Sequence, residues 1–263
     1  MFIPPLIIGE IYYSASRHSE YPDLDGFQST LIINQKGPNI QAWFTNTTNK
    51  IIIISHGHSD NSGLMKEWYS NLFIDMGYDL LIFDFRNHGR SDDMKPVSMG
   101  IKEAEDVAIV LNWISKYNWN KTILFGSSMG AISNLLAIDD LSIIDGLILD
   151  SIFLDFDKMI EYNQQKHNIP QLWRIISQYY LNKRVNIDHK PNILEKIVEL
   201  SHIPILILHG TNDIESPINE LEPIKTIQNQ NLTFIEIQSG EHSRLFYHDL
   251  FHISILEFLN ELV

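Results

Sequence analysis

The 263-residue sequence contains no cysteine. This absence excludes disulfides, thiolate catalysis and zinc sites with cysteine ligands. Basic residues are also scarce, since 19 lysines and arginines stand against 33 aspartates and glutamates and give a formal net charge of −14 at pH 7. Because binding of nucleic-acid phosphates requires clustered basic side chains, a nucleic-acid partner is not expected.

Long apolar segments are missing as well. No run of residues approaches the roughly 18 to 20 that a membrane-spanning helix needs. The N-terminal stretch MFIPPLIIGEIYY is apolar, but it carries no lysine or arginine before Glu10 and prolines interrupt it, which argues against a signal peptide. The sequence therefore predicts a cytoplasmic protein without a transmembrane segment, and leaves open a weak contact of this stretch with a membrane surface.

Short β-rich runs alternate with longer stretches of helical periodicity, which is the pattern of a mostly parallel sheet covered by helices. Several runs, such as KIIIIS and IPILILHG, are continuously apolar, as strands buried on both faces are. The sequence predicts strands at 28–34, 40–44, 50–55, 79–85, 121–126, 145–151, 203–210 and 232–239, the first two antiparallel. It predicts helices at about 63–76, 101–117, 129–139, 218–229 and 244–261.

The segment 152–202 separates two consecutive predicted strands and is much longer than the other connections. It contains apolar residues at helical spacing, as in LWRIISQYYLNKR, and it is too short to fold by itself. No linker rich in glycine, serine or proline marks a domain boundary. We therefore expect one domain over residues 1–263, with 152–202 as a helical lid inserted above the sheet.

The stretch FGSSMG at 125–130 follows a predicted strand and precedes a predicted helix. Gly126 and Gly130 flank Ser128 in the pattern G-x-S-x-G, which forms a sharp turn that holds the central serine in a strained conformation. Glycine is needed on both sides because a side chain there would collide with the neighbouring strand or helix. Ser128 is therefore the candidate nucleophile, and Ser127 is expected only to fill the variable position.

A serine hydroxyl becomes a good nucleophile only when an oriented base removes its proton. Asp213 lies just beyond the strand ILILHG, and His242 lies just beyond the strand FIEIQS. The order Ser128, Asp213, His242 is the one expected of a serine hydrolase built on an α/β sheet, and each residue follows the carboxyl end of a strand. Asp213 is favoured as the acid because its loop precedes the final crossover to the histidine, with Asp150 and Glu215 as alternatives.

An oxyanion hole needs two hydrogen-bond donors aimed at the developing negative charge. One amide is expected from Met129, the residue after the nucleophile. The other is expected from His58 in the loop HGHSDN that follows the strand KIIIIS, with Ser59 as the alternative. The side chains of His56 and His58 make a weak zinc site because no carboxylate cluster accompanies them. No metal and no cofactor are expected.

The motifs IIIISHGHSDN, LLIFDFRNHGRSD, ILFGSSMGA, LILDS, ILILHGTND and GEHSRLF resemble those of serine hydrolases with the α/β-hydrolase fold. The sequence is most similar to the serine aminopeptidase-like branch, over about residues 27–263. One departure is DFRNHGRS, where family members commonly have D-x-R-G-x-G-x-S. Asn87 and His88 replace small or variable positions there, and Arg86 and Ser91 are expected to tie loops together near the site.

These features predict a serine hydrolase that cleaves an ester or thioester of a small-molecule acyl substrate, as a carboxylesterase or acyl-lipid hydrolase does. A peptidase or amidase of the same fold and a non-catalytic binding module are the alternatives. Apolar residues of the lid-like segment, such as Phe153 and Met159, would line an acyl pocket if they face Ser128. Lysines and arginines of that segment would then meet an anionic head group. No oligomeric state is predicted.

Overall fold

The computed structural model describes residues 24–94, 97–138, 143–185, 190–200 and 202–262. Within these residues one eight-stranded sheet has the order β1-β2-β4-β3-β5-β6-β7-β8. The strands are β1 (Gln28–Ile32), β2 (Ile40–Phe44), β3 (Lys50–Ser55), β4 (Asp79–Phe83), β5 (Lys121–Ser127), β6 (Gly146–Asp150), β7 (Ile205–Gly210) and β8 (Leu232–Ile237). β2 pairs antiparallel with β1 on one side and with β4 on the other. The six strands β4, β3, β5, β6, β7 and β8 follow one another in the sheet and are parallel.

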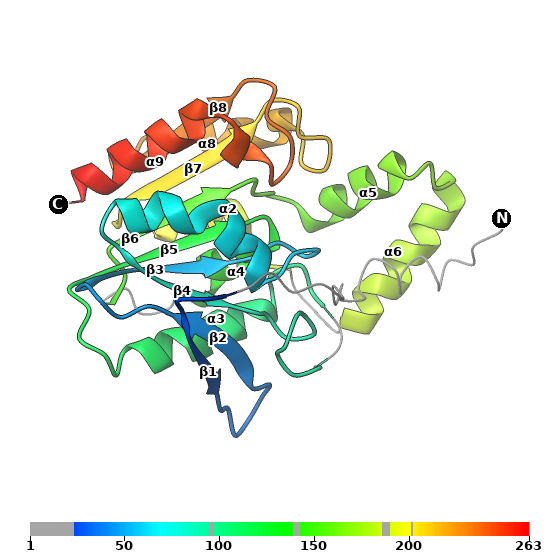
Figure 1. Ribbon diagram of the computed structural model, residues 1–263. Helices are drawn as coiled ribbons and strands as arrows, with labels where there is room; N and C mark the ends of the chain where they lie inside the picture. The colour runs from blue at the N-terminus through cyan, green and yellow to red at the C-terminus, as the bar shows by residue number, and fades with distance from the viewer. Residues whose placement is uncertain (1–23, 95–96, 139–142, 186–189, 201, 263) are drawn as a thin grey trace.

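Helices cover both faces of the sheet (Figure 1). α2 (Ser62–Asp75) and α9 (Asp249–Glu261) pack on one face. α3 (Glu103–Ile114), α4 (Met129–Ala137) and α7 (Ile193–Glu199) pack on the other, together with the short helix α8 (Glu222–Lys225). The remaining helices, α5 (Phe156–Lys166) and α6 (Gln171–Val185), extend beyond the carboxyl ends of the parallel strands (Figure 1). The mostly parallel sheet between two helical layers confirms the predicted fold class.

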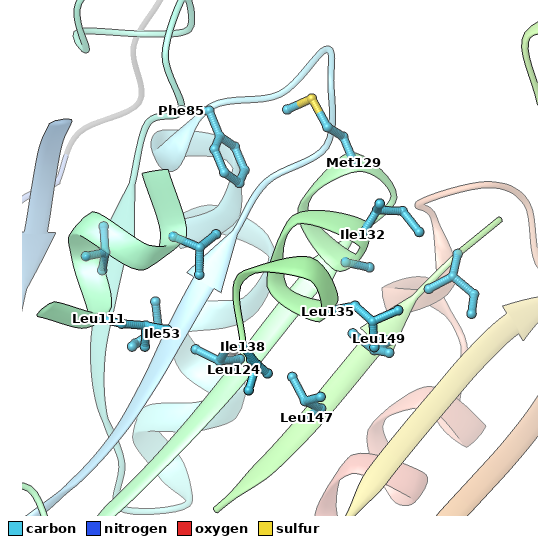
Figure 2. Packing of buried hydrophobic residues seen from close by; sticks show 14 of the residues in the cluster. Ile53, Phe85, Leu111, Leu124, Met129, Ile132, Leu135, Ile138, Leu147 and Leu149 are labelled. Atoms are coloured by element: carbon cyan, nitrogen blue, oxygen red, sulfur yellow. The ribbon is translucent and has the colours of Figure 1, made fainter. Parts of the chain in front are cut away.

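Side chains of the central strands alternate between two apolar layers. In β3, Ile53 belongs to the layer under α3 and α4, whereas Ile52 and Ile54 belong to the layer under α2 and α9. Figure 2 shows the first layer, where Leu124 and Leu149 lie beneath α4. Because both faces of these strands are buried, their sequences are apolar without a polar alternation.

The eight predicted strands are all present, with ends that differ by a few residues, but two predicted helices are wrong in extent. The helix predicted at 218–229 is a 3-10 turn (Ile218–Leu221) followed by the four residues of α8. The chain turns there instead, because the Asn229 side chain accepts a hydrogen bond from the Asn231 amide and competes with helical bonding. The helix predicted at 244–261 begins at Asp249, after a 3-10 turn at Leu245–Tyr247 that buries Leu245 and Phe246.

The segment 152–202 lies between β6 and β7, as expected, and contains α5, α6 and α7. Asp155 caps the N-terminus of α5, and its carboxylate accepts hydrogen bonds from the amides of Asp157 and Lys158. α7 contacts α4 and buries Ile193 and Ile197 in the core. Only α5 and α6 therefore project from the body of the fold (Figure 1).

Replacing Ile53 by alanine is expected to lower the free energy of unfolding by about 2–5 kcal/mol, because a fully buried side chain leaves a cavity between packed strands and helices. Urea denaturation of the purified variant measures this change. Ile33→Ala is the matched control, since Ile33 is 66% exposed, and should change the free energy by no more than about 0.5 kcal/mol. Equal effects of the two substitutions would contradict the assignment of the core.

Candidate active site

Ser128 lies in a sharp turn between β5 and α4, with φ 50° and ψ −115°. Few residues other than glycine adopt such a backbone conformation, and it persists only where the surroundings enforce it. The two flanking glycines permit the close packing. A Cβ at Gly126 would lie 2.6 Å from the amide nitrogen of Ala131, and a Cβ at Gly130 would lie 2.2 Å from the carbonyl oxygen of Ser55. The strand–turn–helix geometry predicted for G-x-S-x-G is therefore present.

Three side chains from distant parts of the sequence form a hydrogen-bonded chain. Nε2 of His242 lies 2.8 Å from Oγ of Ser128, and Nδ1 of His242 lies 2.6 Å from Oδ2 of Asp213. An imidazole that donates from Nδ1 to a carboxylate keeps Nε2 free to accept a proton. The structure thus brings together all three residues that the sequence analysis singled out for nucleophile, base and acid.

Asp213 is held by its own loop. Its Oδ1 accepts hydrogen bonds from the amides of Glu215 and Ser216, at 2.9 and 2.8 Å. Nε2 of the buried His209 lies 3.3 Å from Oδ2. Burial by itself raises the pKa of Asp213, but His242, His209 and the amide hydrogen bonds outweigh it and leave this pKa below its usual value. Asp213 is therefore an ionised carboxylate aimed at His242.

The two alternative acids are placed differently. Glu215 reaches within 4.0 Å of Nε2 of His242, which is the nitrogen that faces Ser128, and not of Nδ1. Asp150 is fully buried at the end of β6, where its carboxylate accepts a hydrogen bond from the hydroxyl of Ser151. Asp213 is the carboxylate that contacts Nδ1.

The surroundings of His242 favour its charged form. Burial by itself lowers the pKa of the His242 imidazole, but the charge and hydrogen bond of Asp213, with smaller contributions from Glu215 and Asp150, raise it to about 9. An imidazolium at His242 is therefore stabilised in this site.

The predicted oxyanion donors border the same cavity as Ser128. Met129 is the first residue of α4, so that its amide belongs to the positive end of the helix dipole next to Ser128. The carbonyl oxygen of His58 lies 2.6 Å from Nε2 of the buried His88, which holds the loop in place. Burial and His88 lower the pKa of the His58 side chain to about 3, which keeps this ring neutral. Ser59, the alternative donor, borders the cavity as well.

The DFRNHGRS loop is tied down as expected. The guanidinium of Arg86 is buried and donates to both carboxylate oxygens of Asp106, at 2.7 to 3.0 Å. The hydroxyl of Ser91 donates to the Asp84 carbonyl oxygen at 2.5 Å and accepts from the Gln41 amide at 2.9 Å. These contacts join the loop to α3 and β2, and they set the position from which His88 reaches the loop of His58.

A cavity of about 1060 Å³ lies over Ser128. Its apolar wall comes from Met99 and from Phe153, Met159 and Ile160 of the segment 152–202. Lys166 of α5 also borders the cavity, and its Nζ lies 2.8 Å from Oε1 of Glu215. Leu172 and Tyr179 of the same segment are exposed and do not line the cavity.

Within the described ranges, no group of three or more histidine, aspartate or glutamate side chains is arranged to hold a metal ion. In the same part of the chain, none of the helices combines the length and the apolar character needed to cross a membrane.

Ser127 is more than a spacer. Its hydroxyl lies 2.9 Å from the hydroxyl of Ser243, the residue after His242, so the expectation of a filler residue is wrong. Sequence reasoning also missed Tyr69, Ser151 and Ser243, whose hydroxyl and amide groups gather around Asp150 and the loop of His242. Ser127, Ser151 and Ser243 lie within motifs quoted above, but nothing in those motifs indicates that their hydroxyl groups converge, and Tyr69 lies in no such motif.

A sequence profile of the family described as "Serine aminopeptidase, S33" matches residues 46–196. The chain belongs to this family. The Bacillus subtilis protein YqkD is 28% identical over 203 residues, which are 74% of this chain and 66% of YqkD. The Escherichia coli K12 protein YfhR is 23% identical over 271 residues, which are 98% of this chain and 89% of YfhR.

Among solved structures, the Pyrococcus furiosus esterase Pf2001 is similar with a TM-score of 0.79 at 18% identity, covering 95% of this chain and 97% of the esterase. This likeness shows the α/β-hydrolase fold. Together with membership of the serine aminopeptidase family, the fold identifies the protein as a hydrolase.

The substitution Asp213→Asn is expected to lower the pKa of the His242 imidazole by about 1 to 3 pH units, because the largest charge that favours the imidazolium is lost. Titration of the ring protons by NMR measures this pKa without any assay of activity. Glu257→Gln, on the exposed side of α9, is the control and should leave the pKa unchanged. An unaltered His242 pKa in Asp213→Asn would refute the electrostatic role of Asp213.

Proposed function

We propose that the protein is a serine hydrolase that cleaves an ester or thioester of a small-molecule acyl substrate through an acyl-enzyme. The observation that carries the proposal is the chain of hydrogen bonds from Asp213 through His242 to Ser128, with both contacts of the imidazole at 2.8 Å or less. The position of Ser128 at the floor of a large cavity supports it.

In this mechanism Oγ of Ser128 attacks the acyl carbon while Nε2 of His242 takes its proton. The tetrahedral oxyanion is held by the amides of Met129 and His58. When the intermediate collapses, the bond to the leaving oxygen or sulfur breaks and His242 returns the proton to the leaving group. Water then loses a proton to His242 and attacks the acyl carbon. The bond from this carbon to Oγ of Ser128 breaks, His242 returns the proton to Oγ, and the carboxylic acid leaves.

The walls of the cavity favour an acyl substrate over a strongly polar one. Met99, Phe153, Met159 and Ile160 present apolar surface on the side of the projecting segment. We interpret 152–202 as a cap within a single domain of residues 1–263, with α5 and α6 as its projecting part.

Peptide or amide cleavage remains the second candidate, favoured by the description of the family as serine aminopeptidases.

Ser128→Ala is expected to reduce ester hydrolysis by about 10³-fold or more, because no other group supplies the attacking oxygen. The assay uses p-nitrophenyl esters from acetate to dodecanoate, the corresponding thioesters, and aminoacyl p-nitroanilides. Ser115→Ala, which removes an exposed hydroxyl at the end of α3, is the control and should retain full activity.

Near-normal turnover by folded Ser128→Ala would overturn the assignment of the nucleophile. Faster cleavage of the p-nitroanilides than of every ester and thioester would instead replace the ester hydrolase by a peptidase.

A further inference from the structure

Asp150 is the last residue of β6 and lies between the loops that carry Ser128 and His242. Its side chain is completely buried. Its carbonyl oxygen accepts a hydrogen bond from the Ser128 amide at 2.8 Å, so its main chain supports the turn of the nucleophile. The next residue, Ser151, donates its amide to the Leu208 carbonyl at 3.0 Å, which anchors the end of β6 to β7.

The carboxylate of Asp150 is surrounded by hydroxyl groups. Oδ1 accepts from Oγ of Ser151 at 2.7 Å, and Oδ2 faces the phenol oxygen of the buried Tyr69 at 3.4 Å. The hydroxyl of Ser127 is a further hydrogen-bond partner of this carboxylate. Burial raises the pKa of Tyr69 well above its usual value, with Asp150 as a further cause, so that Tyr69 stays a neutral donor.

Two routes lead from this carboxylate to Ser243, the neighbour of His242. Oγ of Ser151 donates to Asp150 and accepts from the Ser243 amide at 2.9 Å. The hydroxyls of Ser127 and Ser243 lie 2.9 Å apart and form the second route. Main chain and side chain of Ser243, the residue that follows His242, are thus both held.

Three residues joined by these contacts share an unfavourable backbone conformation. The φ angles of Ser128, Ser151 and Ser243 are 50°, 56° and 53°, in the left-handed region that favours glycine. Such residues persist when surrounding contacts over-determine them. Asp150 contacts Ser128 and Ser151 directly and reaches Ser243 through a single intervening hydroxyl.

We propose that Asp150 is a positioning residue of the hydrolase site. Its carboxylate holds Ser243 and, through Ser243, keeps the His242 ring oriented toward Ser128. The kinetic test of this role rests on the proposed function, whereas the contacts of Asp150 do not depend on it. Asp150 does not contact the reacting atoms and acts through the hydroxyls around it.

Asp150 also contributes charge. Burial raises the pKa of its carboxyl group to about 6, while the hydrogen bonds from Ser151 and Ser127 and the nearby His242 oppose that rise. Above this pH the ionised carboxylate favours the imidazolium form of His242. Among the described residues, Asp213 and Glu215 from the loop after β7 and His209 from β7 itself also face His242. The cavity around His242 is further bordered by the titratable residues Asp60, Glu241, Lys166, His167, Arg244 and His58.

The variant Asp150→Asn keeps the shape of the side chain and removes its charge. We expect kcat for a p-nitrophenyl ester to fall about 10- to 100-fold with KM nearly unchanged, because the base is displaced while the cavity is intact. The acidic limb of the profile of kcat/KM against pH should move to lower pH. Loss of a negative charge lowers the pKa of His242, and neutral imidazole then persists to lower pH.

Two further variants make the test specific. Ser243→Ala removes the hydroxyl route but leaves the Asp150 charge, so kcat should fall while the acidic limb stays in place. Asp79→Asn removes another buried carboxylate, which accepts from the Thr47 and Thr48 amides at the opposite ends of the parallel strands. Asp79→Asn should change thermal stability without changing kcat or the pH profile.

The inference is overturned if folded Asp150→Asn has the kcat and pH profile of the wild type, or if Asp79→Asn lowers kcat equally. NMR of the His242 ring in Asp150→Asn gives a readout without catalysis, and ring-proton chemical shifts and a pKa that both match the wild type would equally refute the proposal. If the wild type hydrolyses no substrate of the panel and forms no fluorophosphonate adduct, the proposed function fails, whereas the NMR titration still decides the role of Asp150.

Discussion

The backbone at Ser128 turns through a left-handed conformation at the point where β5 meets α4. Three parts of the molecule converge there, because α4 packs so closely that a Cβ on Gly130 would collide with the Ser55 carbonyl of β3, and β6 supplies the carbonyl that accepts the Ser128 amide. The hydroxyl is thereby fixed at the carboxyl edge of the sheet, which is where the loops after β7 and β8 deliver Asp213 and His242. The conformation of Ser128 thus fixes where its hydroxyl lies relative to His242 and Asp213.

The imidazole of His242 is largely buried among several carboxylates, and burial and charge act in opposite directions on its pKa. Burial disfavours the imidazolium, whereas Asp213, Glu215 and Asp150 favour it and prevail. The two buried carboxylates, Asp213 and Asp150, act on His242 from different positions. Asp213 contacts the ring directly, while Asp150 contacts the hydroxyls that hold the neighbouring Ser243. In the proposed mechanism, this arrangement orients the base His242 and stabilises its charge when it takes a proton.

Much of this arrangement follows from local sequence patterns. The continuous apolar runs predicted the buried strands, and G-x-S-x-G predicted the turn at Ser128, because each pattern reflects constraints within a few neighbouring residues. The order of Ser128, Asp213 and His242 could be read from the positions of strand ends. The hydroxyl groups that gather around Asp150 could not be predicted in this way. Ser127 and Ser243 are 116 positions apart in the sequence, and Ser151 and Ser243 are 92 apart. Serine and tyrosine are also common on protein surfaces, so their presence gives no signal. The helix predicted at 218–229 was wrong because a side chain at Asn229 bonds the backbone of its own turn.

The most direct test of the site is the position of a covalent adduct. The wild-type protein is treated with a fluorophosphonate, digested, and mapped by tandem mass spectrometry. A serine activated by His242 reacts with this reagent far faster than the exposed hydroxyls of the chain do. The phosphonate is expected on Ser128 alone, at a rate that rises with pH as His242 loses its proton. An adduct on another residue, or none on folded protein, would contradict the assignment of Ser128 as the nucleophile.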